Sequence, residues 1–336
     1  MSAQTTDELN RLRWDGRPGH YEVYFLKFHD PQTGLAAWLR YTLTAPRPGT
    51  GEARCEVWAV LSDPKTPGRH TAAKDTFPIR ELESSSTPFE IRIRENRLDS
   101  GQCRGSAGAA PGGPRLSWDL RFEPACEPLI HFPLDVMYRA RFPKTKVLSP
   151  NPLARFSGEV AIEGRRFEIR NAPGQQSHLW GSEHALRWAW CNAGDFDEDP
   201  AAVFEGLHSE IRLGPLRVPH ILLFFLRLDG AWHRFAGVRQ CFTNRSRYRA
   251  ESWDFELDNG SLRLQGRASA GRTAFAGVTY LDPTGAHLYC HNTGLADMHL
   301  RILDRKGREL RSLNCRAGAA FETVERRPHA GIPILI

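Results

Sequence analysis

The residue types best suited to chemistry gather in a short segment just past the middle of the chain, Ser177-His178-Leu179-Trp180-Gly181. Hydrating or cyclising an isolated alkene requires a strong general acid to form a carbocation and an aromatic face to stabilise it. In a β-strand, residues two apart point to the same face. His178 and Trp180 are therefore expected to line one cavity together. The competing interpretation of His178 is a structural histidine bonded to the backbone.

An acid for such a reaction occurs in the segment 203–210, which reads Val-Phe-Glu-Gly-Leu-His-Ser-Glu. Strand alternation places Glu205 on the side that carries Leu207, where a carboxyl group would be buried. A carboxyl group in an apolar pocket stays protonated more readily and can act as a general acid. We therefore predict Glu205 as the acid, with His178 and Trp180 nearest the chemistry. A bond to an arginine is the other fate open to an inward carboxylate in an Arg-rich chain.

Five further residues are predicted to contact a substrate. Trp188 and Trp190 lie two apart and could shape a cavity, although core packing is the commoner role of such a pair. The other three are His208, His291 and Asn292. The histidines and cysteines lack the short spacings of a metal site, and the sequence contains neither a phosphate-binding Gly-rich loop nor a dinucleotide fingerprint. No metal and no cofactor are therefore expected.

Strand-like alternation of apolar and polar residues runs through almost the whole sequence. In residues 116–122, for example, Trp118, Leu120 and Phe122 share one face. The dipeptide Glu163-Gly164 joins two such segments as a hairpin. A helical turn is allowed only at 6–10 or 182–186, and residues 142–152, which contain three prolines, are expected to be irregular.

The architecture predicted from this pattern is all-β. A length of 336 residues suggests about two domains. So many antiparallel strands must protect their edges, and closure into barrels does so best. We therefore expect two β-barrels or barrel-like sandwiches in tandem, with a boundary between about residues 145 and 180. A barrel of about eight strands can hold one small ligand.

Composition limits the partners that the chain could have. The net charge is +6, but Arg and Glu alternate in stretches such as residues 90–94, so no nucleic-acid partner is predicted. The longest aliphatic and aromatic run, residues 221–226, is far too short to span a membrane, which leaves at most peripheral membrane contact. Seven widely spaced cysteines and the lack of a basic, apolar leader favour a reduced, cytoplasmic protein. The oligomeric state is left open.

The order of motifs around the middle of the chain resembles a known family. A hairpin with a central glycine, residues 156–170, leads to His-Leu-Trp-Gly at 178–181 and then to Trp188-Ala189-Trp190. This order resembles the two-domain lipocalin-like (calycin) family of carotenoid 1,2-hydratase (hydroxyneurosporene synthase), the AttH-like proteins and, more distantly, tocopherol cyclase. The correspondence covers residues 156–192, and Ser177 stands where the family usually has Asp.

The resemblance implies two tandem antiparallel lipocalin-like β-barrels, at residues 1–170 and 171–336, with an apolar cavity where they meet. Members of the family include cofactor-free hydratases and cyclases of long isoprenoids, in which a His, a Trp and a later acid handle the alkene. The predicted function is a cofactor-independent hydratase or cyclase of a hydrophobic, isoprenoid-like or polyketide-like small molecule. The alternative, which Ser177 favours, is a non-catalytic binding protein for a lipophilic ligand. A structural protein with filled barrels is a third possibility.

Overall fold

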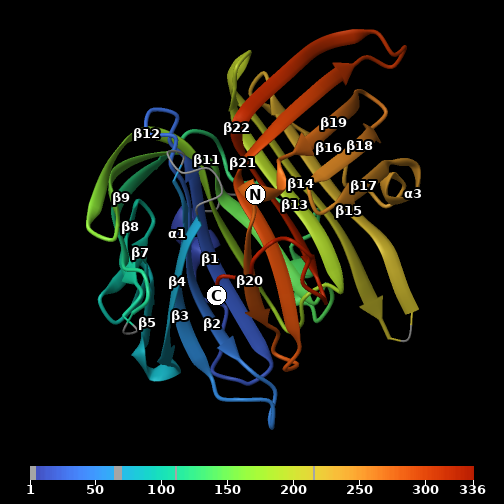
Figure 1. Cartoon of the computed structure of the whole chain (residues 1–336). Helices are drawn as coiled ribbons and strands as arrows, with labels where there is room; N and C mark the ends of the chain where they lie inside the picture. The colour runs from blue at the N-terminus through green and yellow to red at the C-terminus, as the bar shows by residue number, and fades with distance from the viewer. Residues whose placement is uncertain (1–4, 64–69, 110–111, 215) are drawn as a thin grey trace. The chain divides into compact units, whose positions relative to one another are not determined.

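The computed structural model of the chain describes residues 5–63, 70–109, 112–214 and 216–336. Strands dominate these residues, and the predicted all-β fold is confirmed (Figure 1). The chain divides into two compact units. The N-terminal barrel comprises residues 1–184, 280–287 and 335–336, and the C-terminal barrel comprises residues 185–279 and 288–334. The expected division after residue 170 lies within strand β12 (Arg165–Gly181), which belongs to the N-terminal barrel over its whole length.

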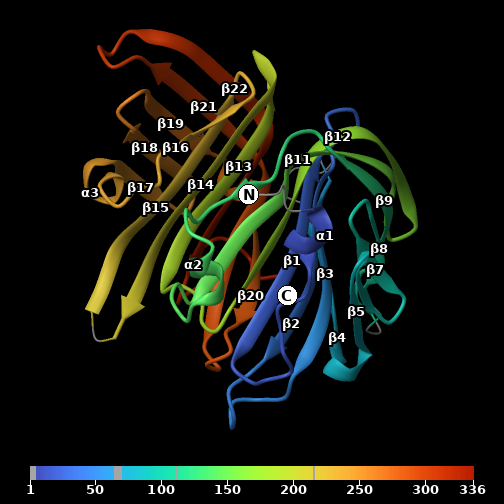
Figure 2. The ribbon, with the colours of Figure 1, turned by 180° about the vertical axis from the view of Figure 1, so that it is seen from behind.

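The N-terminal barrel is built on one antiparallel sheet with the strand order β4-β3-β2-β1-β12-β11-β9-β8-β7-β6-β5, and β10 pairs with β11. Its strands within the described residues are β1 (His20–His29), β2 (Ala36–Ala45), β3 (Arg54–Ser62), β4 (His70–Pro78), β5 (Leu82–Ser86), β6 (Phe89–Ile93), β7 (Asn96–Asp99), β8 (Gln102–Ala107), β9 (Leu116–Pro124), β10 (Leu129–Ile130), β11 (Thr145–Ile162) and β12. Short helices are α1 (Thr6–Asn10), η1 (Ile79–Glu81) and α2 (Val136–Arg139). Strands β3 and β4 approach β8, so the sheet curls round on itself (Figure 2).

Local sequence signals predicted several of these elements. The helical turn allowed at residues 6–10 is α1, whereas residues 182–186 are not helical. Glu163 and Gly164 both have positive φ and join β11 to β12 in a two-residue hairpin, as predicted. The expectation of irregular structure at residues 142–152 was wrong from Thr145 onward, because β11 begins there. Register shifts around Asn151 let the strand accommodate the prolines at 150 and 152.

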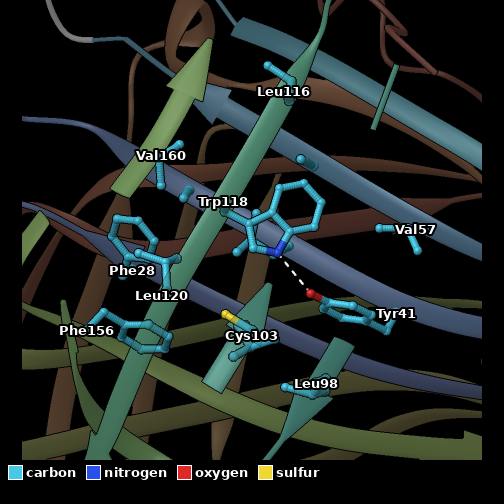
Figure 3. Packing of buried hydrophobic residues seen from close by; sticks show 14 of the residues in the cluster. Phe28, Tyr41, Val57, Leu98, Cys103, Leu116, Trp118, Leu120, Phe156 and Val160 are labelled. Atoms are coloured by element: carbon cyan, nitrogen blue, oxygen red, sulfur yellow. Dashed lines mark hydrogen bonds between the residues drawn. The ribbon is translucent and has the colours of Figure 1, made fainter. Parts of the chain in front are cut away.

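The core of the N-terminal barrel combines aliphatic packing with a short chain of hydrogen bonds. Trp118, Leu120 and Phe122 are all buried on one face of β9, as the alternation predicts. The indole N–H of Trp118 donates to the hydroxyl of Tyr41 at 2.9 Å, as Figure 3 shows. That hydroxyl in turn donates to the carbonyl of Arg104 at 2.8 Å. The polar ends of two large buried rings are thereby satisfied inside an apolar cluster.

A buried carboxylate on β1 fixes the N-terminal segment to this barrel. Glu22 is fully buried and accepts hydrogen bonds from the backbone N–H groups of Arg13 and Trp14, at 2.8 and 3.0 Å. The hydroxyl of Tyr24 donates to the same carboxylate at 3.0 Å, and the Nε2 atom of His178 lies 2.8 Å from it. Residues that precede the first strand are therefore held by a side chain within that strand.

The electrostatics of this carboxylate follow from its donors. Burial by itself would raise the pKa of Glu22. Hydrogen bonds from His178 and His20, together with the charges of these two rings, outweigh burial and lower the pKa to about 2. Glu22 is therefore ionised, and the group is a stabilising anion over the ordinary pH range.

A segment from late in the sequence, residues 280–287, completes the N-terminal barrel. The carbonyl of Pro283 accepts a hydrogen bond from the backbone N–H of Arg47 at 2.8 Å. The carboxylate of Asp282 accepts from the backbone N–H of His184 at 2.7 Å and lies 2.9 Å from its Nδ1 atom. The N-terminal barrel therefore includes residues that follow most of the C-terminal barrel in the sequence.

The C-terminal barrel has the strand order β16-β15-β14-β13-β22-β21-β19-β18-β17, and β20 pairs with β21. Its elements within the described residues are β13 (Arg187–Phe196), β14 (Asp199–Leu213), β15 (Leu216–Leu228), β16 (Ala231–Arg234), α3 (Gln240–Thr243), β17 (Arg245–Arg249), β18 (Ser252–Asp258), β19 (Arg263–Ser269), η2 (Arg272–Ala274), β20 (Ala276–Leu281), β21 (His287–Leu303) and β22 (Glu309–Glu325). Aromatic rings fill its core: the rings of Phe204 and Phe255 stack at 5.1 Å, and Trp253 packs beside Phe224 at 5.2 Å.

Gly158 on β11 provides a test of a close approach between two strands. Its φ is +140°, and a Cβ there would lie 2.2 Å from the carbonyl oxygen of Asp119. We expect Gly158→Ala to lower the free energy of unfolding by about 2–4 kcal/mol, because backbone must move. Gly164→Ala is the matched control, since that turn glycine has nothing within 4 Å and should cost only about 1 kcal/mol. Urea denaturation measures both, and equal losses would contradict the steric account.

Glu22→Gln tests the buried carboxylate. We expect the free energy of unfolding to fall by about 3 kcal/mol at neutral pH, because the donors around position 22 lose their anion. In the unsubstituted protein, the folded pKa of about 2 lies below the ordinary value of 4.5. The contribution of Glu22 is therefore fully present above about pH 4.5 and is lost as the pH falls toward 2. Thermal denaturation across this range should show a smaller acid-induced loss in the variant than in the parent.

Candidate functional site

His178 lies on β12 inside the N-terminal barrel and is fully buried. Its Nδ1 atom is 2.9 Å from the carbonyl of Leu9 in α1, and its Nε2 atom is 2.8 Å from Glu22. Both partners are hydrogen-bond acceptors, and each lies against one of the two ring nitrogens. The ring of Tyr24 stacks on the imidazole at 4.3 Å. This geometry supports the structural interpretation of His178, as a link between α1 and the sheet, while its predicted catalytic role stays a prediction.

Trp180 shares a face with His178, as strand alternation predicts, and the two ring centroids are 4.7 Å apart. The guanidinium of Arg13 lies 4.9 Å from the centroid of the indole ring. A cation of the chain itself therefore occupies one side of this ring. Ser177 points to the opposite face, where its hydroxyl bonds to that of Ser149 at 2.8 Å. The side chains of residues 177 and 178 thus lie on opposite faces of the sheet.

The C-terminal barrel brings together four of the predicted site residues on one side of its sheet. Ala189 and Cys191 on β13 enter the hydrophobic core. Trp188 and Trp190 alternate with them and therefore face the other way. The indole N–H of Trp190 donates to Glu205 on β14 at 3.4 Å. Glu205 is only 1% exposed, which agrees with the predicted burial of its carboxyl group.

A second carboxylate on the same face comes from β22. Glu322 is aligned with Trp190 on one neighbouring strand and with Asn292 on the other. It accepts hydrogen bonds from the indole N–H of Trp188 at 2.8 Å, from the side-chain amide of Asn292 at 3.3 Å and from the thiol of Cys290 at 3.4 Å. Sequence reasoning missed Glu322 because it predicted strand only for residues 309–313 in this part of the chain. Residues 316–324 show no continuous alternation of apolar and polar types, so the local pattern carried no signal for it.

We call Trp188, Trp190, Glu205, Asn292 and Glu322 the indole–carboxylate cluster. It places two carboxyl groups and two indole rings on the face of the sheet that lies opposite the barrel core. A carboxyl group can transfer a proton, and an indole face attracts a developing cation. The arrangement therefore supplies both of the functions that alkene protonation needs.

His208 and His291 do not join this cluster. His208 aligns with Ala189 and Leu222, both core residues, so its side chain lies on the core side of the sheet. Its ring nitrogens bond to the hydroxyl of Ser246 at 2.8 Å and to His220 at 3.1 Å. The substrate contact predicted for His208 remains a prediction, and it would take place on the other side of the sheet from Glu205.

His291 is likewise turned away from the cluster, since its neighbour Asn292 is the residue that faces Glu322. The backbone N–H of His329 donates to Nε2 of His291 at 3.1 Å. Burial, and then the charge of His329, lower the pKa of His291 to about 4. His291 is therefore a neutral acceptor that holds the C-terminal segment against the barrel.

No group of three or more His, Cys, Asp or Glu residues in the described part of the chain has the geometry to hold a metal ion. None of its helices has the length and apolar character needed to cross a membrane.

Several known proteins are similar to this chain over most of its length. Two uncharacterised proteins of Mycobacterium tuberculosis, MT0513 of strain CDC 1551 and Rv0493c of strain H37Rv, are each 24% identical over 291 residues, which cover 86% of this chain and 83% of theirs. Among solved structures, an AttH-like protein of Nitrosomonas europaea superposes with a TM-score of 0.58 at 13% identity, covering 97% of both chains. Kievitone hydratase of Nectria haematococca gives a TM-score of 0.55 at 9% identity, covering 96% of both.

These structural likenesses concern the fold, and they confirm the lipocalin-like architecture expected from the mid-chain motifs. The model of the tocopherol cyclase-like family matches residues 142–323, which include every member of the indole–carboxylate cluster. Since this match spans more than half of the sequence, the chain belongs to the tocopherol cyclase-like family.

Proposed function

We propose that the chain is a cofactor-independent hydratase or cyclase that protonates an alkene of a hydrophobic, isoprenoid-like or polyketide-like substrate. The observation that carries the proposal is the burial of Glu205, at 1% exposure, beside the indole N–H of Trp190. A general acid must lie where water does not compete for its proton, and an aromatic neighbour must face the cation that forms. Membership of the tocopherol cyclase-like family and the fold shared with kievitone hydratase support the same class of reaction.

The proposed reaction uses the two carboxyl groups of the cluster in different roles. The carboxyl proton of Glu205 moves to one alkene carbon and leaves a carbocation at the other. In hydration, water attacks this cation and its extra proton returns to Glu205; in cyclisation, a hydroxyl group of the substrate attacks instead. Glu322, held by Trp188 and Asn292, orients the attacking oxygen.

The polarity of the cluster defines the substrate that would suit it. Indole rings offer broad apolar faces, whereas the carboxyl groups and the amide of Asn292 offer few polar contacts. A long hydrophobic chain with one reactive double bond near a polar group matches this combination. The competing function, a carrier for a lipophilic molecule, would use the same rings for binding and leave the carboxyl groups without a role in turnover.

Glu205→Gln tests the proton donor directly. Linear isoprenoid alkenes and prenylated phenols would be incubated with the protein in D2O, and deuterium incorporation into the substrate followed by mass spectrometry. We expect the variant to lose at least about 100-fold in rate, because the amide cannot supply the proton. Glu309→Gln, an exposed glutamate on β22, is the matched control and should retain full activity. A fully active Glu205→Gln would refute the assignment, and binding of a lipophile by the unsubstituted protein without deuterium uptake would identify a carrier.

Trp190→Phe tests the hydrogen bond to that acid while keeping an aromatic ring in place. Loss of one hydrogen bond of about 1 kcal/mol should lower kcat about fivefold. KM should change much less, since the apolar face remains. Steady-state kinetics separate the two parameters, and Trp188→Phe, which removes the bond to Glu322 instead, gives the comparison. A rise in KM with unchanged kcat would mean that Trp190 serves only to bind substrate.

A further inference from the structure

The flank of the C-terminal barrel around α3 exposes large apolar side chains. Phe242 is 87% exposed and Val238 is 82% exposed. Within the same short helix, Cys241 points inward toward the carbonyl of Leu222 on β15. Figures 1 and 2 both show α3 beside β15, and α3 also contacts β18. The helix is thus anchored through one side and presents an aromatic ring to solvent on the other.

Arginines are frequent near these apolar side chains in the sequence. Residues 230–250 contain five arginines and neither Asp nor Glu. Three of these arginines alternate along β17, the last strand of the sheet, and all three are exposed there. Among the described residues, the guanidinium groups of Arg239, Arg247 and Arg249 have no hydrogen-bonding or ion-pairing partner. This local excess of positive charge was not evident from the alternation of Arg and Glu elsewhere in the sequence.

A small hollow lies within the arginine surface. It has a volume of about 190 Å³ and is lined by Arg247, Arg249, Ser252, Asp254 and Arg267. The single acid of this set, Asp254, already forms an ion pair with Arg267 at 2.8 Å. The remaining guanidinium groups and the hydroxyl of Ser252 are donors without a paired anion. Bidentate donors of this kind suit a phosphate group.

We propose that this flank docks on the surface of an anionic phospholipid bilayer. Phe242 and Val238 would enter the interfacial region, and Arg239, Arg247 and Arg249 would pair with lipid phosphates. Exposed apolar side chains next to basic residues are the combination by which proteins bind at such interfaces. The exposed apolar side chains of Phe242 and Val238 favour a membrane over a nucleic acid. The inference stands independently of the proposed reaction, because it uses none of the residues of the indole–carboxylate cluster.

Sedimentation with vesicles tests the proposal on the full chain. We expect binding to vesicles made of equal parts phosphatidylcholine and phosphatidylglycerol, and at least about tenfold weaker binding to phosphatidylcholine alone. The double variant Arg247→Gln/Arg249→Gln should lose about tenfold or more in affinity, and added salt should weaken the unsubstituted protein similarly. Val238→Ser/Phe242→Ser should also lose about tenfold, because its contacts are apolar. All four side chains are exposed, so the variants should remain folded, as circular dichroism would verify.

A charge-matched control distinguishes binding through this local surface from binding through the net charge of the protein. Arg305→Gln/Arg308→Gln lies at the β21–β22 turn and removes the same number of charges. We expect it to bind vesicles like the unsubstituted protein. Equal losses in the two arginine double variants, or equal binding to neutral and anionic vesicles, would overturn the proposal. Tighter binding to single-stranded or duplex nucleic acid than to anionic vesicles, lost in Arg247→Gln/Arg249→Gln, would assign the surface to nucleic acid instead.

Discussion

Alternation along each strand is the constraint on which the rest of this molecule depends. Every strand must offer one set of side chains to a barrel core and the next set to the other face of the sheet. In β13 the small residues Ala189 and Cys191 enter the core, which leaves both tryptophans for the opposite face. The indole–carboxylate cluster exists because β14 and β22 follow the same rule with Glu205 and Glu322. A shift of one residue in any of these strands would exchange core and cluster.

The same rule explains why the fold and part of the site could be predicted from sequence. Period-two patterns and the Glu163-Gly164 turn are local, so the all-β class and a hairpin followed directly. Glu205 could be assigned to a buried face because its neighbours at 203–210 alternate. The pairing of Trp188 with Glu322 could not be found in this way, since it joins residues 134 positions apart. Only the strand order β14-β13-β22-β21 brings them together.

His178 shows how a distinctive motif can serve structure. Its sequence context suggested a cavity wall, and alternation correctly placed it beside Trp180. The local pattern carried no information about Glu22, which is 156 residues away, or about the carbonyl of Leu9. Those partners use both ring nitrogens. A substrate would have to displace one of them before it could exchange a proton with this histidine, whereas Glu205 accepts a hydrogen bond from the indole N–H of Trp190.

The return of residues 280–287 to the N-terminal barrel has a consequence for the order of synthesis. A growing chain emerges from its amino end, so β1 to β12 are available long before Asp282 and Pro283 exist. The first barrel must then wait, with Arg47 and His184 lacking these partners, until most of the second barrel has been translated. Folding of the two barrels is thereby linked in time, and a polypeptide that stops after residue 184 would lack part of its own first barrel.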